Sequence, residues 1–337
     1  MAATTIPNDL ILYHYNASPY ARRIVWYLTL RQIAYAECLQ PPYLPRPDLK
    51  TLLNISYRRI PLLAHARHIF LDSRHILAHL ESCAPPSTGA PSLAPSTADG
   101  RALLRLLERY TTDTGIFSRA ASLIPPTAPL LKDAKFQADR KEFSGREFSP
   151  EAFAKGRSES LAVIRDLFEL LEYTLLSDGR LWIAEERLTV CDIEGVWVID
   201  WLLSMPGALP KELFGEHIYP KVFAWHARFQ ADVKTAKEAM GKPVRVSGED
   251  AAAHVLGSEI LYEGRHDATD PLGLRQGDEV NLWPTDSGMG TANRDTGRLV
   301  ALGRNEVIIE KDCHGKNLRL HAPRWGFRVL KGRGAKL

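Results

Sequence analysis

The chain has 337 residues, with 43 basic and 40 acidic side chains and a formal net charge of +3. At roughly 100–200 residues per domain, this length predicts two or three domains. The near balance of charge argues against a dedicated nucleic-acid binder, and four widely spaced cysteines exclude a disulfide scaffold. No apolar run reaches the ~18–20 residues that a membrane helix needs. The first ten residues lack a basic region and an apolar core, so we expect no secretory signal and a cytoplasmic location.

Composition divides the chain into three segments. Residues 9–83 alternate between strand-like and helix-like patterns, and residues 84–100 are rich in proline, serine and glycine, which is typical of a linker. Residues 101–240 have leucines at helical spacing, although we expect 125–158 to be a long loop with one short helix. Residues 245–337 hold short β-rich runs between turn residues, which predicts a small all-β, barrel-like domain.

The first segment follows an order of elements that defines a fold class. Ser18 followed by Pro19 is typical of a helix start, because proline lacks the N–H that the first turn leaves unpaired. Asp72 and Ser73 open a second helix. Strands are expected at residues 10–15, 34–39, 60–64 and 68–71. The order βαβ, then ββα, predicts a thioredoxin-like α/β domain.

Four motifs, taken in order, resemble those of the glutathione transferase superfamily. Thr189 and Asp192 form one of them, a capping box in which each side chain reaches the backbone of the other. The four are Ser18–Arg23, Ile60-Pro61, Asp72-Ser73 and the pair of Trp182–Ala184 with Leu188–Ile193. Tyr57–Pro61 also resembles a fungal and bacterial branch of that superfamily. The resemblance implies a thioredoxin-like domain at 9–83 and an all-helical domain at 101–240, and it does not extend to 245–337.

The resemblance implies glutathione as co-substrate and a group that activates its thiol. Lowering a thiol pKa from about 8.5 by two units requires ~2.7 kcal/mol of preferential thiolate stabilisation, which a hydroxyl donor and a helix N-terminus can supply. Ser18 stands where several classes have a catalytic serine and others a cysteine. The alternative is that Ser18 only caps the helix. Tyr13 and Tyr15 compete with it, because some classes use a tyrosine near this strand end, although core packing is the favoured interpretation of both.

The remaining glutathione contacts are also implied by resemblance. Ile60 precedes Pro61, which is cis in this family, so that the Ile60 backbone groups face the cysteinyl part of the tripeptide. Ser73 suits the γ-glutamyl carboxylate and Asp72 its ammonium group, although Asp72 can also simply cap the helix. Arg59 is expected to pair with the glycyl carboxylate, with a solvated surface arginine as the alternative.

A second substrate, a small hydrophobic electrophile, would lie between this strand edge and the helical segment. Core packing is the ordinary alternative for the aromatic residues there. The candidate walls are Tyr15, Tyr110, Phe117 and Trp197.

Two other kinds of chemistry are not expected. The chain has a serine, Ser18, where a dithiol-exchange enzyme needs a cysteine, which argues against dithiol exchange. His75 and His79 have zinc-like spacing, but the sequence offers no third ligand, so no metal is expected.

These features together predict a cytoplasmic glutathione transferase that acts in detoxification or secondary metabolism. Its expected partners are a small-molecule electrophile and a second copy of the chain in a homodimer, with neither nucleic acid nor membrane. Two alternatives stay open. One is a glutathione-dependent isomerase or lyase, which shares the thiolate but forms no conjugate. The other is a non-catalytic binding protein in which the β-rich segment is the working part.

Overall fold

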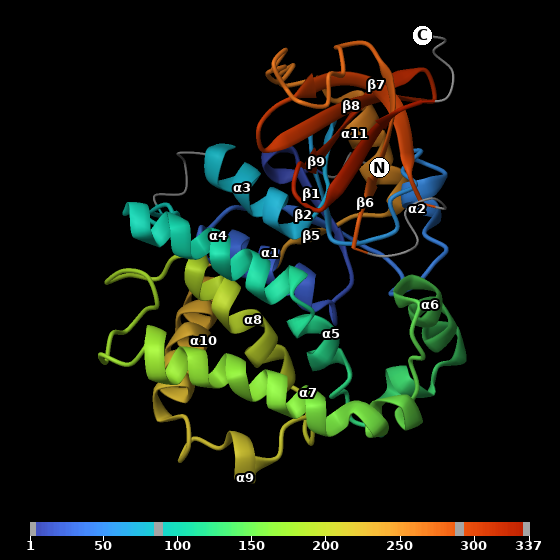
Figure 1. The fold of residues 1–337 in the computed structure, drawn as a ribbon. Helices are drawn as coiled ribbons and strands as arrows, with labels where there is room; N and C mark the ends of the chain where they lie inside the picture. Colours follow the sequence, from blue (N-terminus) through green and yellow to red (C-terminus); the bar gives the residue numbers. More distant parts are fainter. Residues whose placement is uncertain (1–4, 84–89, 287–292, 333–337) are drawn as a thin grey trace.

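A computed structural model describes residues 5–83, 90–286 and 293–332 (Figure 1). Its central feature is one ten-stranded sheet with the order β10-β6-β7-β8-β9-β4-β3-β1-β2-β5. The strands are β1 (Leu10–His14), β2 (Ala36–Leu39), β3 (Leu62–His65), β4 (His68–Phe70), β5 (Val244–Arg245), β6 (Glu279–Pro284), β7 (Asp295–Leu302), β8 (Glu306–Cys313), β9 (Lys316–Pro323) and β10 (Phe327–Lys331). Both ends of the chain thus contribute to the same sheet.

The first four strands and two helices have the expected thioredoxin-like order. β1 pairs with β2 in parallel and with β3 in antiparallel fashion, and α1 (Pro19–Leu30) and α3 (Ser73–Cys83) follow β1 and β4. Side chains alternate across β1. Leu12 packs into the core on the side of α1 and α3, whereas Ile11 packs into a second core on the opposite face. The predicted α/β fold of this segment is confirmed.

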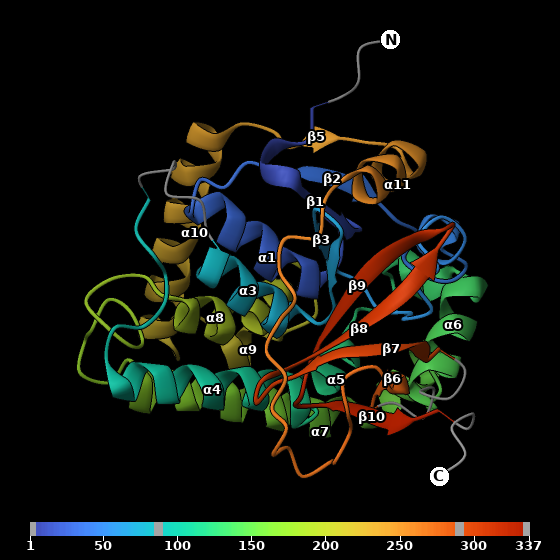
Figure 2. The ribbon, with the colours of Figure 1, turned by 90° about the horizontal axis from the view of Figure 1, so that it is seen from above.

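The C-terminal strands correct the expectation of a separate barrel. β9 pairs in parallel with β4, with Ile69 opposite Leu320, and so extends the N-terminal sheet. Figure 2 shows β9 as the C-terminal strand nearest to β3, with β8, β7, β6 and β10 beyond it. The second core contains side chains of both parts, such as Ile11 and Leu299. The physical reason is that β4 has an open edge, and pairing with β9 satisfies its backbone groups.

The segment that follows the helical part also returns to the first domain. β5 pairs with β2 at the other edge of the sheet, and α11 (Gly248–Gly257) contributes Ala251 and Val255 to the second core. The sequence analysis predicted neither α11 nor β9. The alanine-rich sequence of α11 contains little apolar periodicity, and its packing comes from the opposing strands.

The helices between these parts form an all-α layer. They are α4 (Ala98–Asp113), α5 (Ile116–Ala121), α6 (Ala134–Ser144), α7 (Pro150–Leu170), α8 (Val190–Leu203), α9 (Lys211–Phe214) and α10 (Pro220–Met240), with the short α2 (Pro47–Lys50) in the first domain. α8 is buried along almost its whole length, and the capping box of Thr189 and Asp192 is present as predicted. No helix in the described ranges has the length and apolarity required to span a membrane.

The stretch expected to be mostly loop is instead largely helical. α6 and the start of α7 lie within residues 125–158, and α6 lies apart from the other long helices, near α2 (Figure 1). Its Asp139 accepts hydrogen bonds from the Leu44 amide at 3.1 Å and from Arg58 Nη2 at 2.8 Å. Tertiary contacts with the first domain therefore fix α6, whose polar sequence alone favours a loop.

Candidate active site

Three chain segments meet at one end of the central strands β1, β3 and β4, which is called the sheet edge of the site below. Tyr13, near the end of β1, lies opposite Leu62 at the start of β3, and β4 pairs with β3 in antiparallel fashion. Because of these directions, residues 15–18, 60–61 and 72–73 extend past the same edge. The segments that the resemblance assigns to glutathione are therefore neighbours in the fold.

Ser18 stands at the start of α1 and caps that helix. Its Oγ accepts a hydrogen bond from the Ala21 amide at 3.2 Å, and Pro19 occupies the first turn. Ser18 is 2% exposed. The cap contact uses a lone pair of Oγ, so the hydroxyl hydrogen can still point toward an anion. Capping and thiolate stabilisation are thus compatible roles.

Tyr15 lies half-buried among charged side chains of other segments. Burial raises the pKa of Tyr15, and the positive charges of Arg140 and Arg46 oppose this rise. The negative charge of Asp139, which pairs with Arg140, raises the pKa of Tyr15 as burial does. Sequence reasoning missed both arginines because neither belongs to a motif, and Arg140 arrives only through the docking of α6. The two cations favour negative charge at Tyr15, three residues before Ser18.

The Ile60–Pro61 peptide bond is cis, as the resemblance implies. Asp72 has a positive φ of 67°, and its Oδ1 and Oδ2 accept hydrogen bonds from the Arg74 side chain at 3.0 and 2.8 Å. Burial raises the pKa of Asp72, but the charge and hydrogen bonds of Arg74 outweigh it and hold the pKa at about 2. Asp72 is therefore ionised beside the start of α3, with Ser73 as the first residue of that helix.

Ser73 is held by a charge network inside the protein. Arg23 Nη1 donates to Ser73 Oγ at 2.8 Å, and the same guanidinium pairs with Glu194 of α8. Arg23 and Glu194 are both fully buried. Arg23 also lies over the Trp197 ring, 5.1 Å from its centroid. This pair ties α1 and α3 to the helical layer, and no sequence motif indicated it.

Arg59 is paired with a carboxylate from the C-terminal part. Its Nη1 lies 3.0 Å from Asp286 Oδ2 and its Nη2 lies 2.5 Å from Asp286 Oδ1. The guanidinium also lies over the Phe143 ring of α6, 5.1 Å from the centroid. Asp286 is the second residue after β6, so the C-terminal sheet reaches the expected glutathione site. An internal carboxylate is therefore bound where the resemblance implies the glycyl carboxylate of a ligand.

The predicted aromatic walls divide into two groups. Tyr110 donates its phenol hydrogen to Asp166 of α7 at 2.8 Å, and Trp197 is fully buried in the core. Phe117 is half-buried and contacts Tyr20 edge to face, with centroids 4.7 Å apart. Phe117 also stacks on the half-buried Trp201 at 5.2 Å. Its partners Tyr20 and Trp201 thus form the more exposed part of the aromatic cluster, with Trp197 as its buried base.

A groove of about 840 Å³ lies elsewhere, between α3 and α4. Its lining includes Arg74, Glu108 and Trp325, but not Ser18. Trp325 belongs to the turn between β9 and β10, and its Nε1 donates to Asp113 of α4 at 2.7 Å. The C-terminal sheet therefore contacts the helical layer through Trp325, in addition to its contact with Arg59 of the first domain through Asp286.

Comparisons with known proteins support this interpretation of the fold. Residues 12–88 match the family model of the glutathione S-transferase N-terminal domain, and residues 119–238 match that of a domain of unknown function, DUF7962. A glutathione transferase-like protein from Pseudomonas syringae is 21% identical with a TM-score of 0.73, over 96% of this chain and 100% of that chain. Beta-etherase LigF from a Sphingobium species is 17% identical with a TM-score of 0.53, over 68% of this chain and 99% of that chain. No curated protein matches the chain.

The chain thus has a glutathione transferase-like fold, and its first domain matches the N-terminal domain of that superfamily. Because the Pseudomonas match covers 96% of this chain, it also includes most of the C-terminal strands.

Proposed function

We propose that the chain is a glutathione transferase-like enzyme that binds glutathione at the sheet edge and activates its thiol. The observation that carries the proposal is the convergence of residues 15–18, 60–61 and 72–73 at this edge. In this proposal the thiol lies beside Ser18, at the N-terminus of α1. The helix dipole, the Ser18 hydroxyl and the charges of Arg46 and Arg140 then all favour the thiolate.

The rest of the tripeptide follows the sheet edge from this point. The backbone N–H and C=O of Ile60 pair with the cysteinyl part of glutathione. Both groups are available for this because Ile60 lies outside the strands. The γ-glutamyl group lies at the start of α3, where Ser73 and the helix amides favour its carboxylate and ionised Asp72 favours its ammonium group. Arg59 takes the glycyl carboxylate in place of Asp286.

The electrophile lies over the half-buried aromatic side chains of the helical layer. Tyr20, Phe117 and Trp201 offer apolar ring surface beside the start of α1, which suits a small hydrophobic molecule. In this proposal Tyr15 contacts the side of the electrophile that faces away from these three rings. In the reaction, the thiolate sulfur attacks an electrophilic carbon, and a C–S bond forms while the bond from that carbon to a halide or an epoxide oxygen breaks and the electron pair leaves with that group. The expected homodimer stays a prediction.

A matched pair of serine variants tests the proposal. Ser18 and Ser149 each precede a proline and cap a helix with a 3.2 Å contact, to the Ala21 and Ala152 amides respectively. Glutathione binding is measured by calorimetry, and thiolate absorbance is followed against pH. The wild type should lower the thiol pKa by one to two units, roughly 1.4–2.7 kcal/mol. Ser18→Ala should abolish most of that shift and retain binding, whereas Ser149→Ala should leave it unchanged.

Two outcomes would contradict the proposal. A wild-type protein that binds no glutathione would exclude a glutathione-dependent enzyme of any kind. Binding with a normal thiol pKa in the wild type would exclude thiol activation at Ser18. Product analysis with aryl halides and epoxides then separates conjugation from isomerisation.

A further inference from the structure

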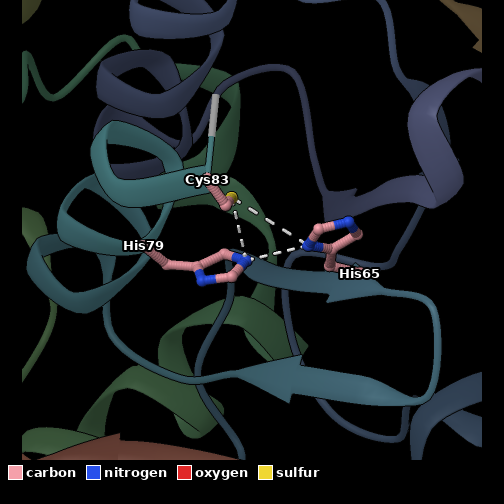
Figure 3. Close-up of side chains that lie close together, drawn as sticks. All are labelled: His65, His79 and Cys83. Carbon is pink, nitrogen blue, oxygen red and sulfur yellow. Dashed lines mark hydrogen bonds between the residues drawn. The ribbon is translucent and has the colours of Figure 1, made fainter. Parts of the chain in front are cut away.

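We propose that His65, His79 and Cys83 form a binding site for Zn²⁺, independent of the proposed glutathione site. His65 ends β3, and His79 and Cys83 lie one turn apart at the end of α3. Figure 3 shows that the two imidazole rings and the thiol point toward one another from these two elements. His and Cys are the side chains that zinc prefers in proteins.

The separations between the three ligand atoms fit one tetrahedral ion. His65 Nδ1 and His79 Nε2 are 3.0 Å apart, and Cys83 Sγ lies 3.3 Å from His79 Nε2 and 4.0 Å from His65 Nδ1. Zinc bonds of about 2.0–2.1 Å to nitrogen and about 2.3 Å to sulfur place tetrahedral ligands about 3.3–3.6 Å apart. Each observed separation lies within about 0.5 Å of this range. A shift of side chains alone would therefore complete the coordination.

The surrounding structure holds the ligands in place before a metal arrives. The His79 ring stacks on Phe70, with centroids 3.6 Å apart and an interplanar angle of 17°. His79 is 7% exposed, and its helix is anchored by the buried Leu77 and Leu80. His65 is held by strand pairing, because it lies opposite Leu10 of β1. Preorganised ligands bind a metal at a lower cost in conformational entropy.

A second cluster nearby, His75, His321 and Glu306, could also hold a metal ion by its ligand types, but it differs in containing a carboxylate. Glu306 Oε1 lies 2.8 Å from both His75 Nε2 and His321 Nδ1, and His321 Nε2 lies 2.7 Å from His68 Nδ1. In that cluster the Glu306 carboxylate accepts a hydrogen bond from each of the two histidines and supplies a negative charge. In the part of the chain that the structure describes, no carboxylate hydrogen-bonds His65, His79 or Cys83. The three groups hydrogen-bond one another instead, and no negative charge among their hydrogen-bond partners competes with a cation.

The site has three protein ligands and leaves the fourth position to water. Both His65 and Cys83 are half-buried, which gives solvent and metal access. A bound ion would join the β3–β4 hairpin to the last turn of α3, immediately before the link to the helical layer. The sequence analysis singled out His75 and His79, but His79 and Cys83 have the same i, i+4 spacing. Folding instead pairs His79 with Cys83 and brings the third ligand, His65, from a strand.

Metal titration of the full chain tests the site. After treatment with a chelator and a reductant, the wild type should bind one equivalent of Zn²⁺ with micromolar or tighter affinity by calorimetry. Co²⁺ should give the intense visible bands of a tetrahedral site and a thiolate-to-metal charge-transfer band. Cys83→Ser should remove the charge-transfer band and weaken Zn²⁺ binding at least tenfold. His65→Gln should weaken it to a similar extent.

Two matched variants locate the ion. His75→Gln removes a histidine of the same helix that belongs to the Glu306 cluster, and Cys313→Ser removes a thiol outside the site. Both should bind Zn²⁺ like the wild type. The proposal is overturned if the wild type binds no Zn²⁺, if Cys83→Ser retains the charge-transfer band, or if His75→Gln weakens binding as much as His65→Gln. Circular dichroism of each variant checks that a loss of binding does not come from unfolding, and Zn²⁺ should raise the Tm of the wild type but not of Cys83→Ser.

Discussion

Asp286→Asn should tighten glutathione binding, if Arg59 holds the glycyl carboxylate as proposed. In the structure Asp286 occupies both terminal nitrogens of Arg59, at 3.0 and 2.5 Å. The side chains of Arg59 and Asp286 are 20% and 53% exposed, so water and salt screen the pair. An exposed ion pair is worth roughly 0.2–1 kcal/mol. Glutathione has to displace this contact, and its removal should lower the Kd by about 1.4- to 5-fold.

Calorimetry at low and high ionic strength measures this effect. The gain in affinity should shrink at high salt, because screening already weakens the ion pair in the wild type. Asp312→Asn, an exposed position on β8, makes the same change in net charge away from Arg59 and should leave the Kd unchanged. Weaker binding by Asp286→Asn would refute the reasoning, since it would mean that Asp286 itself contacts the ligand.

Two further predictions concern the charges around Ser73 and Asp72. Arg23→Met or Glu194→Leu should each cost about 3–5 kcal/mol of unfolding free energy, because each leaves a fully buried charge unpaired. The double variant should cost much less than the sum in guanidinium denaturation, and additive losses would contradict this. Arg74→Met should cost about 2 kcal/mol at pH 7, because Arg74 holds the pKa of Asp72 at about 2, below its ordinary value of 3.8. That contribution is present above pH ~4 and lost as the pH falls toward 2, so acid unfolding, followed by circular dichroism, should begin at a higher pH in the variant. An unchanged midpoint would exclude the role of Arg74.

Local patterns predicted those parts of the molecule whose causes are local. Ser18 and Pro19 start α1 as expected, since a cap and a first-turn proline act within a few residues. The capping box of Thr189 and Asp192 is confirmed for the same reason. The strands β1 to β4 also lie close to their predicted ranges, because short apolar runs between turn residues define them.

The parts that the sequence did not reveal depend on contacts between distant segments. α6 is polar, and it is held through Asp139 by Arg58, which lies 81 residues earlier. Arg59 and Asp286 are separated by 227 residues. Their pairing depends on where β6 ends relative to the first domain, which no local pattern encodes. The same holds for His65, whose approach to His79 requires the fold of the whole hairpin and helix.

The sequence resemblance to glutathione transferases does not extend to residues 245–337, and the packing of this segment explains its presence. A separate barrel would need its own core, but Val280, Leu299 and Leu320 pack in one core with Ile11 and Ala64 of the first domain. Deletion of residues 245–337 would expose this shared apolar surface and reopen the β4 edge, so the first domain should lose stability together with the deleted strands. The same strands carry Asp286 to Arg59. The C-terminal segment is therefore part of the first domain's structure, and through Asp286 it is positioned to adjust the proposed glutathione site.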